Sequence, residues 1–234
     1  MKAAKLVNRP VNKEPMFNFA EPAPVYLVGV FIAVHLSLMI APRWLEAIFA
    51  KYAILHVWGR IGLTRLEQIP SLVLHGFLHG GWLHLISNSF MIIALGIASI
   101  RGAKLLSIRK GRPRSGVSAF FQLFFAGVIL GALAQWLYWY LSGAPLGFEA
   151  PRAIGASGGA SALFAAGGWA LGGAKQMFKF ALAWGFINFV MVLAEAYTGI
   201  NLAWAAHLGG FAAGMILAPL LVEASATRFK VLKD

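Results

Sequence analysis

Ser157 and His207 are the side chains of this sequence with the chemistry of a nucleophile and its general base. A histidine ring nitrogen can take the proton of a serine hydroxyl while the oxygen attacks a carbonyl carbon. Ser157 lies in a glycine-rich run over residues 155–159, and Gly210 and Gly214 follow His207 at helical spacing. Acyl-transfer chemistry is therefore available if the fold brings the two side chains together.

His84 and Asn88 are a second pair of polar side chains with a chemically useful spacing. Because they are four residues apart, they share one face of a helix. Both can donate hydrogen bonds to the oxyanion that forms on an attacked carbonyl, and so can the backbone N–H of Ser157 if that residue begins a helix. Losing one such donor typically costs about 3–4 kcal/mol of transition-state stabilisation. We therefore expect these groups to surround one site.

The elements that must position these residues are membrane-spanning helices. Of the 234 residues, 59% are hydrophobic and 12% are charged, and the mean hydropathy is +0.73. A soluble domain carries about 25% charged residues, so this composition excludes a soluble globular enzyme and a disordered chain. The lack of cysteine excludes a disulfide scaffold. Charge-free stretches predict an all-α membrane protein with six transmembrane helices, over residues 24–41, 83–100, 116–141, 155–172, 178–197 and 203–221.

The basic residues predict the orientation of the chain in the membrane. Of the 20 Lys and Arg residues, 15 fall in the two tails and in the segments after the second and fourth helices. Cytoplasmic segments are enriched in Lys and Arg, so both termini are expected in the cytoplasm. We predict tails over residues 1–23 and 222–234 and a membrane domain over 24–221. The net charge of +12 then reflects topology, and the basic run at 101–114 is not expected to bind nucleic acid.

The predicted topology brings the polar residues to one depth. The second, fourth and sixth helices all run from the outer face inward, and each carries its polar group near its outer end. Small residues allow backbones to approach closely in lipid, and those expected to pack around the site are Gly155, Gly158, Gly210 and Gly214. The first outer segment, about residues 43–83, mixes aromatic with charged residues and is expected to lie partly in the membrane.

Three motifs together resemble the signature of the rhomboid intramembrane serine proteases. They are the histidine and asparagine at positions 84 and 88, Gly-x-Ser-Gly at 155–158, and His-x-x-Gly-x-x-x-Gly at 207–214. The resemblance implies a six-helix rhomboid-like bundle with Ser157 as the nucleophile, His207 as the general base and no acidic third residue. It also implies that His84, Asn88 and the Ser157 N–H stabilise the oxyanion. It further implies that the fifth helix and its neighbouring loop act as a gate for substrate entering from the bilayer.

The resemblance further implies an endopeptidase that cuts peptide bonds in or near the transmembrane segments of membrane proteins. Neither a metal ion nor a cofactor is implied. The six-helix form resembles bacterial members, so we expect a multi-pass protein of the bacterial inner membrane with its active site open to the outer side. The partners are then the lipid bilayer and transmembrane substrates, and the sequence leaves the oligomeric state open.

Two features depart from the family pattern. The first outer loop lacks a clear Trp-Arg pair and has Arg43-Trp44 and Trp58-Gly59-Arg60 instead. The other departure is a single position after the serine. Many members carry a tyrosine one helical turn after the serine, where its ring packs on the histidine, and this chain has Ser161 there. Another group must then orient the ring of His207. A contact at Gly210 is one candidate, and the sequence identifies no other.

Three other interpretations fit parts of the pattern. Residues 155–159 match the Gly-x-Ser-x-Gly elbow of α/β hydrolases, but the chain lacks the soluble α/β pattern which that motif needs. A transporter or proton relay would use the same histidines, yet its polar residues would spread through the depth of the membrane. A rhomboid-like pseudoprotease would usually lack the serine or the histidine, and this chain has both.

The remaining polar residues of the predicted membrane domain are expected to be structural. His75 and His79 have no carboxylate or cysteine at usable spacing, so packing or hydrogen bonding is expected of them rather than metal binding. Hydrogen bonds between helices are expected of Gln122, Gln135 and Asn188.

Overall fold

The computed structural model of the chain describes residues 21–53, 55–56, 69–111, 115–144, 151–198 and 202–224. Its elements, in chain order, are α1 (Ala23–Met39), α2 (Arg43–Tyr52), β1 (Leu55–His56), α3 (Ser71–Leu74), the 3₁₀ helix η2 (His75–Phe77), α4 (Trp82–Lys110), α5 (Gly116–Leu141), β2 (Arg152–Ala153), α6 (Ser157–Thr198) and α7 (Trp204–Leu221). Most of both predicted tails, and residues 57–68 of the predicted outer segment, lie outside the described residues.

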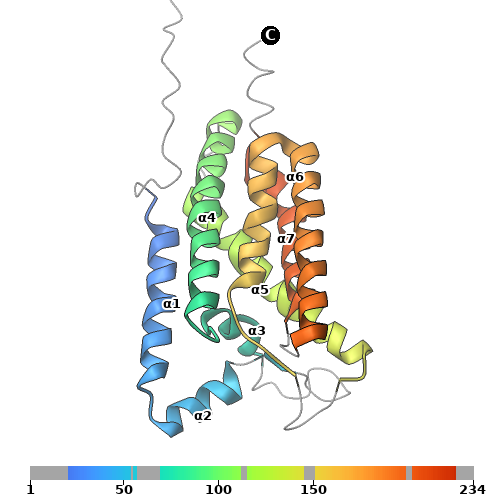
Figure 1. Cartoon of the computed structure of the whole chain (residues 1–234). Helices are drawn as coiled ribbons and strands as arrows, with labels where there is room; N and C mark the ends of the chain where they lie inside the picture. Colours follow the sequence, from blue (N-terminus) through green and yellow to red (C-terminus); the bar gives the residue numbers. More distant parts are fainter. Residues whose placement is uncertain are drawn as a thin grey trace, which may run out of the picture.

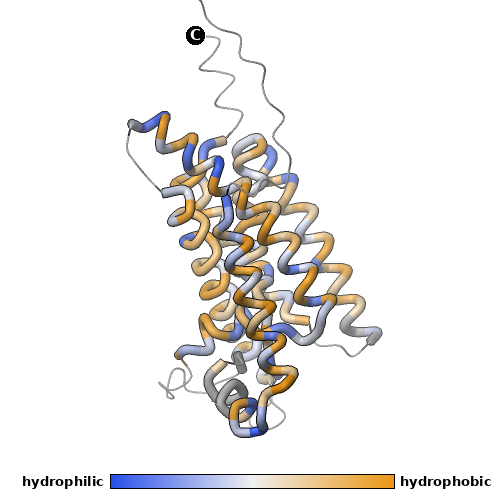
Figure 2. Tube along the Cα trace, turned by 90° about the vertical axis from the view of Figure 1, so that its left-hand side faces the viewer, coloured by the Kyte–Doolittle hydropathy of each residue, from blue (hydrophilic) through white to orange (hydrophobic). Residues whose placement is uncertain are grey.

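Long apolar helices make up the bundle (Figure 1). α4, α5, α6 and α7 are long and apolar enough to cross a membrane, and α1 is an apolar helix of 17 residues. Hydrophobic residues follow the helices along their length (Figure 2), and large apolar side chains such as Phe90, Phe186 and Ile216 are exposed on the bundle surface. Such a surface suits helices that are surrounded by lipid. The predicted class, an all-α membrane protein, is confirmed.

α6 folds back on itself at a pair of glycines. Gly172 (φ −171°, ψ 24°) and Gly173 (φ 66°, ψ −152°) leave helical geometry and divide α6 into a first limb, residues 157–171, and a second limb, residues 174–198. The positive φ of Gly173 favours glycine, because a side chain there would crowd the backbone. The two limbs lie side by side (Figure 1), with Gly168 of the first facing Phe180 of the second. They occupy the positions of the helices predicted at 155–172 and 178–197.

α4 is longer than the sequence predicted. It continues past residue 100 through the basic stretch and ends at Lys110. Leucine, lysine and arginine favour helices, and Arg109 and Lys110 lie in the last turn, where cations interact favourably with the helix dipole. Gly111 ends the helix in the left-handed conformation (φ 59°), and its N–H donates to the Ile108 carbonyl at 3.2 Å. Residues 101–110, predicted as loop, are therefore helical.

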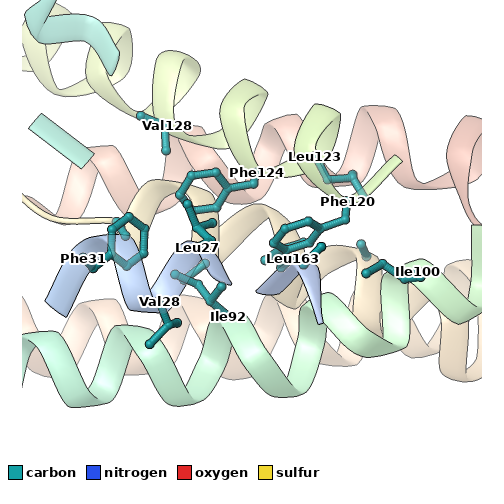
Figure 3. Packing of buried hydrophobic residues seen from close by; sticks show 14 of the residues in the cluster. Leu27, Val28, Phe31, Ile92, Ile100, Phe120, Leu123, Phe124, Val128 and Leu163 are labelled. Atoms are coloured by element: carbon teal, nitrogen blue, oxygen red, sulfur yellow. The ribbon is translucent and has the colours of Figure 1, made fainter. Parts of the chain in front are cut away.

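The main core lies between α1, α4, α5 and the first limb of α6 (Figure 3). Phe31, Phe120, Phe124, Ile92 and Leu163 are fully buried in it. Ring contacts cross between helices, and the centroids of Phe31 and Phe124 are 6.1 Å apart. Van der Waals packing is the main force that associates helices in lipid. This core therefore fixes α4 relative to the start of α6.

Short elements lie at the end of the bundle where α4 begins. α2 runs crosswise to α1 there (Figure 1), and its Trp44 is exposed. β1 pairs with β2 in antiparallel register, with Leu55 opposite Ala153. Whether this segment enters the membrane interface stays a prediction.

Candidate active site

Ser157 is the first residue of α6. β2 leads into it through Ile154, Gly155 and Ala156, and the φ of Gly155 is +122°, a value that residues with a side chain rarely adopt. The Ala160 N–H donates to the Ala156 carbonyl at 2.9 Å and closes the first turn. The N–H of Ser157 therefore has no carbonyl one turn back in the helix. The positive end of the helix dipole also favours negative charge at this point.

The turn before Ser157 lies against α4. A Cβ placed on Gly155 would come 2.6 Å from His84 Nε2 and 3.6 Å from Asn88 Nδ2. The position thus needs glycine both for its φ and for the closeness of His84. Asn88 is buried, and within the described part of the chain its Nδ2 has no hydrogen-bond partner. A donor in this state, beside the glycine that precedes the serine by two residues, can bond to an incoming oxygen.

The same turn is held by η2. The Gly155 N–H donates to the His75 carbonyl at 2.8 Å, and the His75 ring donates from Nδ1 to the Ser71 carbonyl at 2.7 Å. Burial lowers the pKa of the His75 imidazole to about 4, although the hydrogen bond to Ser71 acts in the opposite direction. The ring is therefore neutral at pH 7. The hydrogen-bonding role predicted for His75 is confirmed.

His79 packs between aromatic rings. Its ring centroid lies 5.3 Å from that of Phe31 and 5.3 Å from that of His84. Burial, together with the neighbouring His84 and His35, lowers the pKa of His79 to about 4, so this ring is also neutral at pH 7. The packing role predicted for it is confirmed. Over the residues that the structure describes, no group of three or more His, Cys, Asp or Glu side chains could hold a metal ion.

His207 is buried in the first turn of α7. Its Nδ1 lies 3.0 Å from Oδ1 of Asn188, which is on the second limb of α6. The Trp184 ring, one turn earlier on that limb, lies beside the imidazole, with centroids 5.8 Å apart and planes at 51°. Trp184 Nε1 also donates to the His207 carbonyl at 3.5 Å. Side chains of the second limb therefore hold the ring.

The first limb of α6 meets α7 through backbone. A Cβ on Gly210 would lie 2.8 Å from the Cα of Gly158, and a Cβ on Gly214 would lie 2.8 Å from the Cα of Ala162. Neither site has room for a side chain. Gly158 directly follows Ser157, and Gly210 lies one turn after His207. The contact therefore sets the first turn of α6 against the turn of α7 that follows the histidine.

Ser161 occupies the position where many rhomboids have tyrosine. It is buried, and its Oγ donates to the Ser157 carbonyl at 2.6 Å, a bond within its own helix. The Gly210 contact is with the Gly158 backbone. The ring of His207 instead has Asn188 and Trp184 as neighbours.

Two of the three predicted interhelical hydrogen bonds are confirmed. Asn188 bonds to His207, and Gln135 Oε1 accepts from the Ala206 N–H at 3.1 Å, which joins α5 to α7. The prediction for Gln122 is wrong, because its Nε2 donates to Ser118 Oγ at 2.8 Å within α5. Sequence reasoning missed Trp184 and did not pair Asn188 with His207. The sequence signal for Asn188 was that it is a single amide in a long apolar stretch.

The fold and the site define a helical membrane protein with a serine at a helix N-terminus and a buried histidine on the adjacent helix. A buried amide donor that has no partner among the described residues lies beside Gly155, in the turn before the serine. The family model of the Rhomboid domain matches residues 66–224, from α3 to α7. The chain belongs to the rhomboid family, whose members are generally intramembrane serine proteases that act on transmembrane substrates. No curated protein matches the chain significantly.

Proposed function

We propose that the chain is a serine endopeptidase that hydrolyses peptide bonds in or near the transmembrane segments of membrane proteins, with Ser157 as nucleophile and His207 as general base. The observation that carries the proposal is the backbone contact between Gly158 and Gly210. This contact joins the turns next to both residues at a separation that only glycine permits. The serine and the histidine therefore lie next to the same close contact between two helices.

The proposed reaction begins when Ser157 Oγ attacks the carbonyl carbon of the scissile bond and His207 Nε2 takes the hydroxyl proton. The carbonyl oxygen becomes negatively charged and accepts hydrogen bonds from the Ser157 N–H, Asn88 Nδ2 and His84. His207 then gives the proton to the departing amine as the C–N bond breaks, which leaves an acyl-serine. Water that loses a proton to His207 attacks the acyl carbon, and the carboxylic acid and the free serine are released.

We further propose six membrane crossings, formed by α1, α4, α5, the two limbs of α6 and α7. Ion pairs support the placement of the chain ends. Lys104 pairs with Glu21 just before α1, and Arg109 Nε lies 2.7 Å from the Glu223 carboxylate just after α7. The start of α1, the end of α7 and the basic end of α4 thus meet at one end of the bundle, which the positive-inside rule assigns to the cytoplasm. Ser157 then opens to the outer side of a bacterial inner membrane.

The direct test is cleavage of a single-pass membrane protein by the purified chain in lipid vesicles. Wild type should release a fragment, and Ser157→Ala should release none, because no other oxygen can form the acyl intermediate. Ser99→Ala is the matched control, since Ser99 is a buried serine on α4 whose hydroxyl bonds to the Leu95 carbonyl at 2.8 Å. It should cleave like wild type. Equal cleavage by wild type and Ser157→Ala would refute the proposal.

A further inference from the structure

The second limb of α6 presents a specific face to His207. Over residues 182–190, Trp184 and Asn188 are the buried positions, whereas neighbours such as Phe186 and Phe189 are 67% and 58% exposed. Trp184 and Asn188 are four residues apart, so they share one face of the limb. Both contact His207. An amide buried in an apolar helix is unfavourable unless it is bonded, and here its bonds run to the imidazole and to its own helix.

The hydrogen bonds of Asn188 determine which ring nitrogen of His207 carries the proton. Asn188 Nδ2 donates to the Trp184 carbonyl at 2.8 Å, and a carbonyl can only accept. The amide is therefore oriented with Oδ1 toward His207, 3.0 Å from Nδ1. Oδ1 can only accept as well, so the hydrogen between the two atoms is on Nδ1. In the neutral ring this leaves the lone pair on Nε2, which is the form able to take a proton from a hydroxyl.

We propose that Asn188 is a positioning residue that completes a Ser157–His207–Asn188 arrangement, in which the amide oxygen fixes the tautomer and the direction of the His207 ring. The inference rests on the proposed function. In many members a tyrosine at the position of Ser161 packs on the histidine ring. In this chain Asn188 supplies the group that orients the ring. When Nε2 takes the serine proton, the Nδ1–H bond to Asn188 becomes a bond from a charged ring and strengthens. Because Asn188 lies on the second limb, the active form of the base depends on where that limb lies.

The first experiment is kinetic and compares Asn188→Leu with Asn188→Asp in the cleavage assay. Leucine keeps the approximate size of the side chain and removes the acceptor, so kcat should fall about 10- to 100-fold, the size expected for losing a hydrogen bond to a charged group. KM should change by less than about twofold, since the amide is buried and bonds to His207 and to its own helix. Asn188→Asp retains an acceptor oxygen and should restore kcat to within about fivefold of wild type.

Gln122→Leu is the matched control, because it removes an exposed amide that donates to Ser118 Oγ within α5. It should match wild type in kcat and KM. An unchanged kcat in Asn188→Leu would overturn the inference, and so would a loss that Asn188→Asp does not restore. Absence of Ser157-dependent cleavage in wild type would instead refute the proposed function.

The second experiment does not depend on activity. In protein labelled with ¹⁵N-histidine, nitrogen shifts of His207 at mildly alkaline pH should show a protonated Nδ1 and an unprotonated Nε2, with His207→Ala used to assign the signals. Asn188→Leu should show a mixture of tautomers, provided that the variant elutes and melts as wild type does. A predominantly Nε2-protonated ring in wild type would overturn the inference, whether or not the chain cleaves any substrate.

Discussion

At the scale of single residues, Asn88 is a buried amide beside the turn that precedes Ser157. Its Nδ2 is buried without a partner in the described part of the chain and lies next to Gly155. A donor is kept in this state at a cost of about 1–3 kcal/mol. That cost is recovered if the group bonds to a charge that exists only in the transition state. The unpaired amide therefore supports the oxyanion role proposed for Asn88.

Asn88→Ala should accordingly reduce kcat by about 100- to 1000-fold and leave KM nearly unchanged, because the oxyanion is absent from the bound substrate. Initial rates over a range of substrate concentrations in vesicles measure both constants. The variant should melt at or slightly above the temperature of wild type, since an unsatisfied buried donor is removed. A higher KM at constant kcat would show that Asn88 binds the substrate and not the oxyanion.

The sequence contains much of this site. The four-residue spacing of His84 and Asn88 places them on one helix face, and both approach the turn before Ser157. The pairing of His207 with Asn188 could not be predicted. It depends on the rotation and the depth of the second limb of α6 relative to α7, and a uniformly apolar helix in lipid carries no periodic pattern that reports its rotation.

At the scale of elements, the contact of α6 with α7 is the most restrictive feature of the site. Gly210→Leu would place a side chain where even a Cβ lies 2.8 Å from the Gly158 Cα. The helices must then separate, and a displacement of about 1 Å can cost about 100-fold in rate. We expect cleavage activity to fall by at least that factor although Ser157 and His207 remain.

Gly29→Leu controls for the same substitution in a membrane helix, because a Cβ on Gly29 of α1 would meet nothing within 4 Å. It should retain activity and melting temperature. Activity assays and thermal melts of both variants in the same detergent make the comparison. Full activity of Gly210→Leu would mean that the Gly158–Gly210 contact does not set the geometry of the site.

Helix boundaries were predictable where the sequence carries its own stop signals. α5 spans Gly116–Leu141, the range expected from its charge-free stretch, and Ser115 caps it by accepting from the Ser118 N–H at 3.3 Å. The end of α4 was misplaced because charge marks the edge of the membrane and not the edge of the helix. Arg101 to Lys110 can leave the bilayer while the backbone bonds continue, and the helix stops only at Gly111.

At the scale of the whole molecule, the orientation in the membrane decides what the proposed enzyme can cut. α4, α6 and α7 all begin at the end of the bundle that carries Gly155, His84 and His207. The opposite end carries the pairs Lys104–Glu21 and Arg109–Glu223. If the basic end faces the cytoplasm, the nucleophile meets substrates and water from the outer side. The same bundle inserted the other way would act on cytoplasmic ends of its substrates.

The chain has no cysteine, so single cysteines can report this orientation without background. Ser115 and Ser142 are exposed and flank α5 at its two ends. In intact cells a membrane-impermeant maleimide should label Ser142→Cys and should reach Ser115→Cys only after the membrane is permeabilised. Both variants should retain cleavage activity, because serine to cysteine is a small change outside the site. The reverse labelling pattern would place Ser157 at the cytoplasmic face, and labelling of both in intact cells would mean that α5 does not cross the membrane.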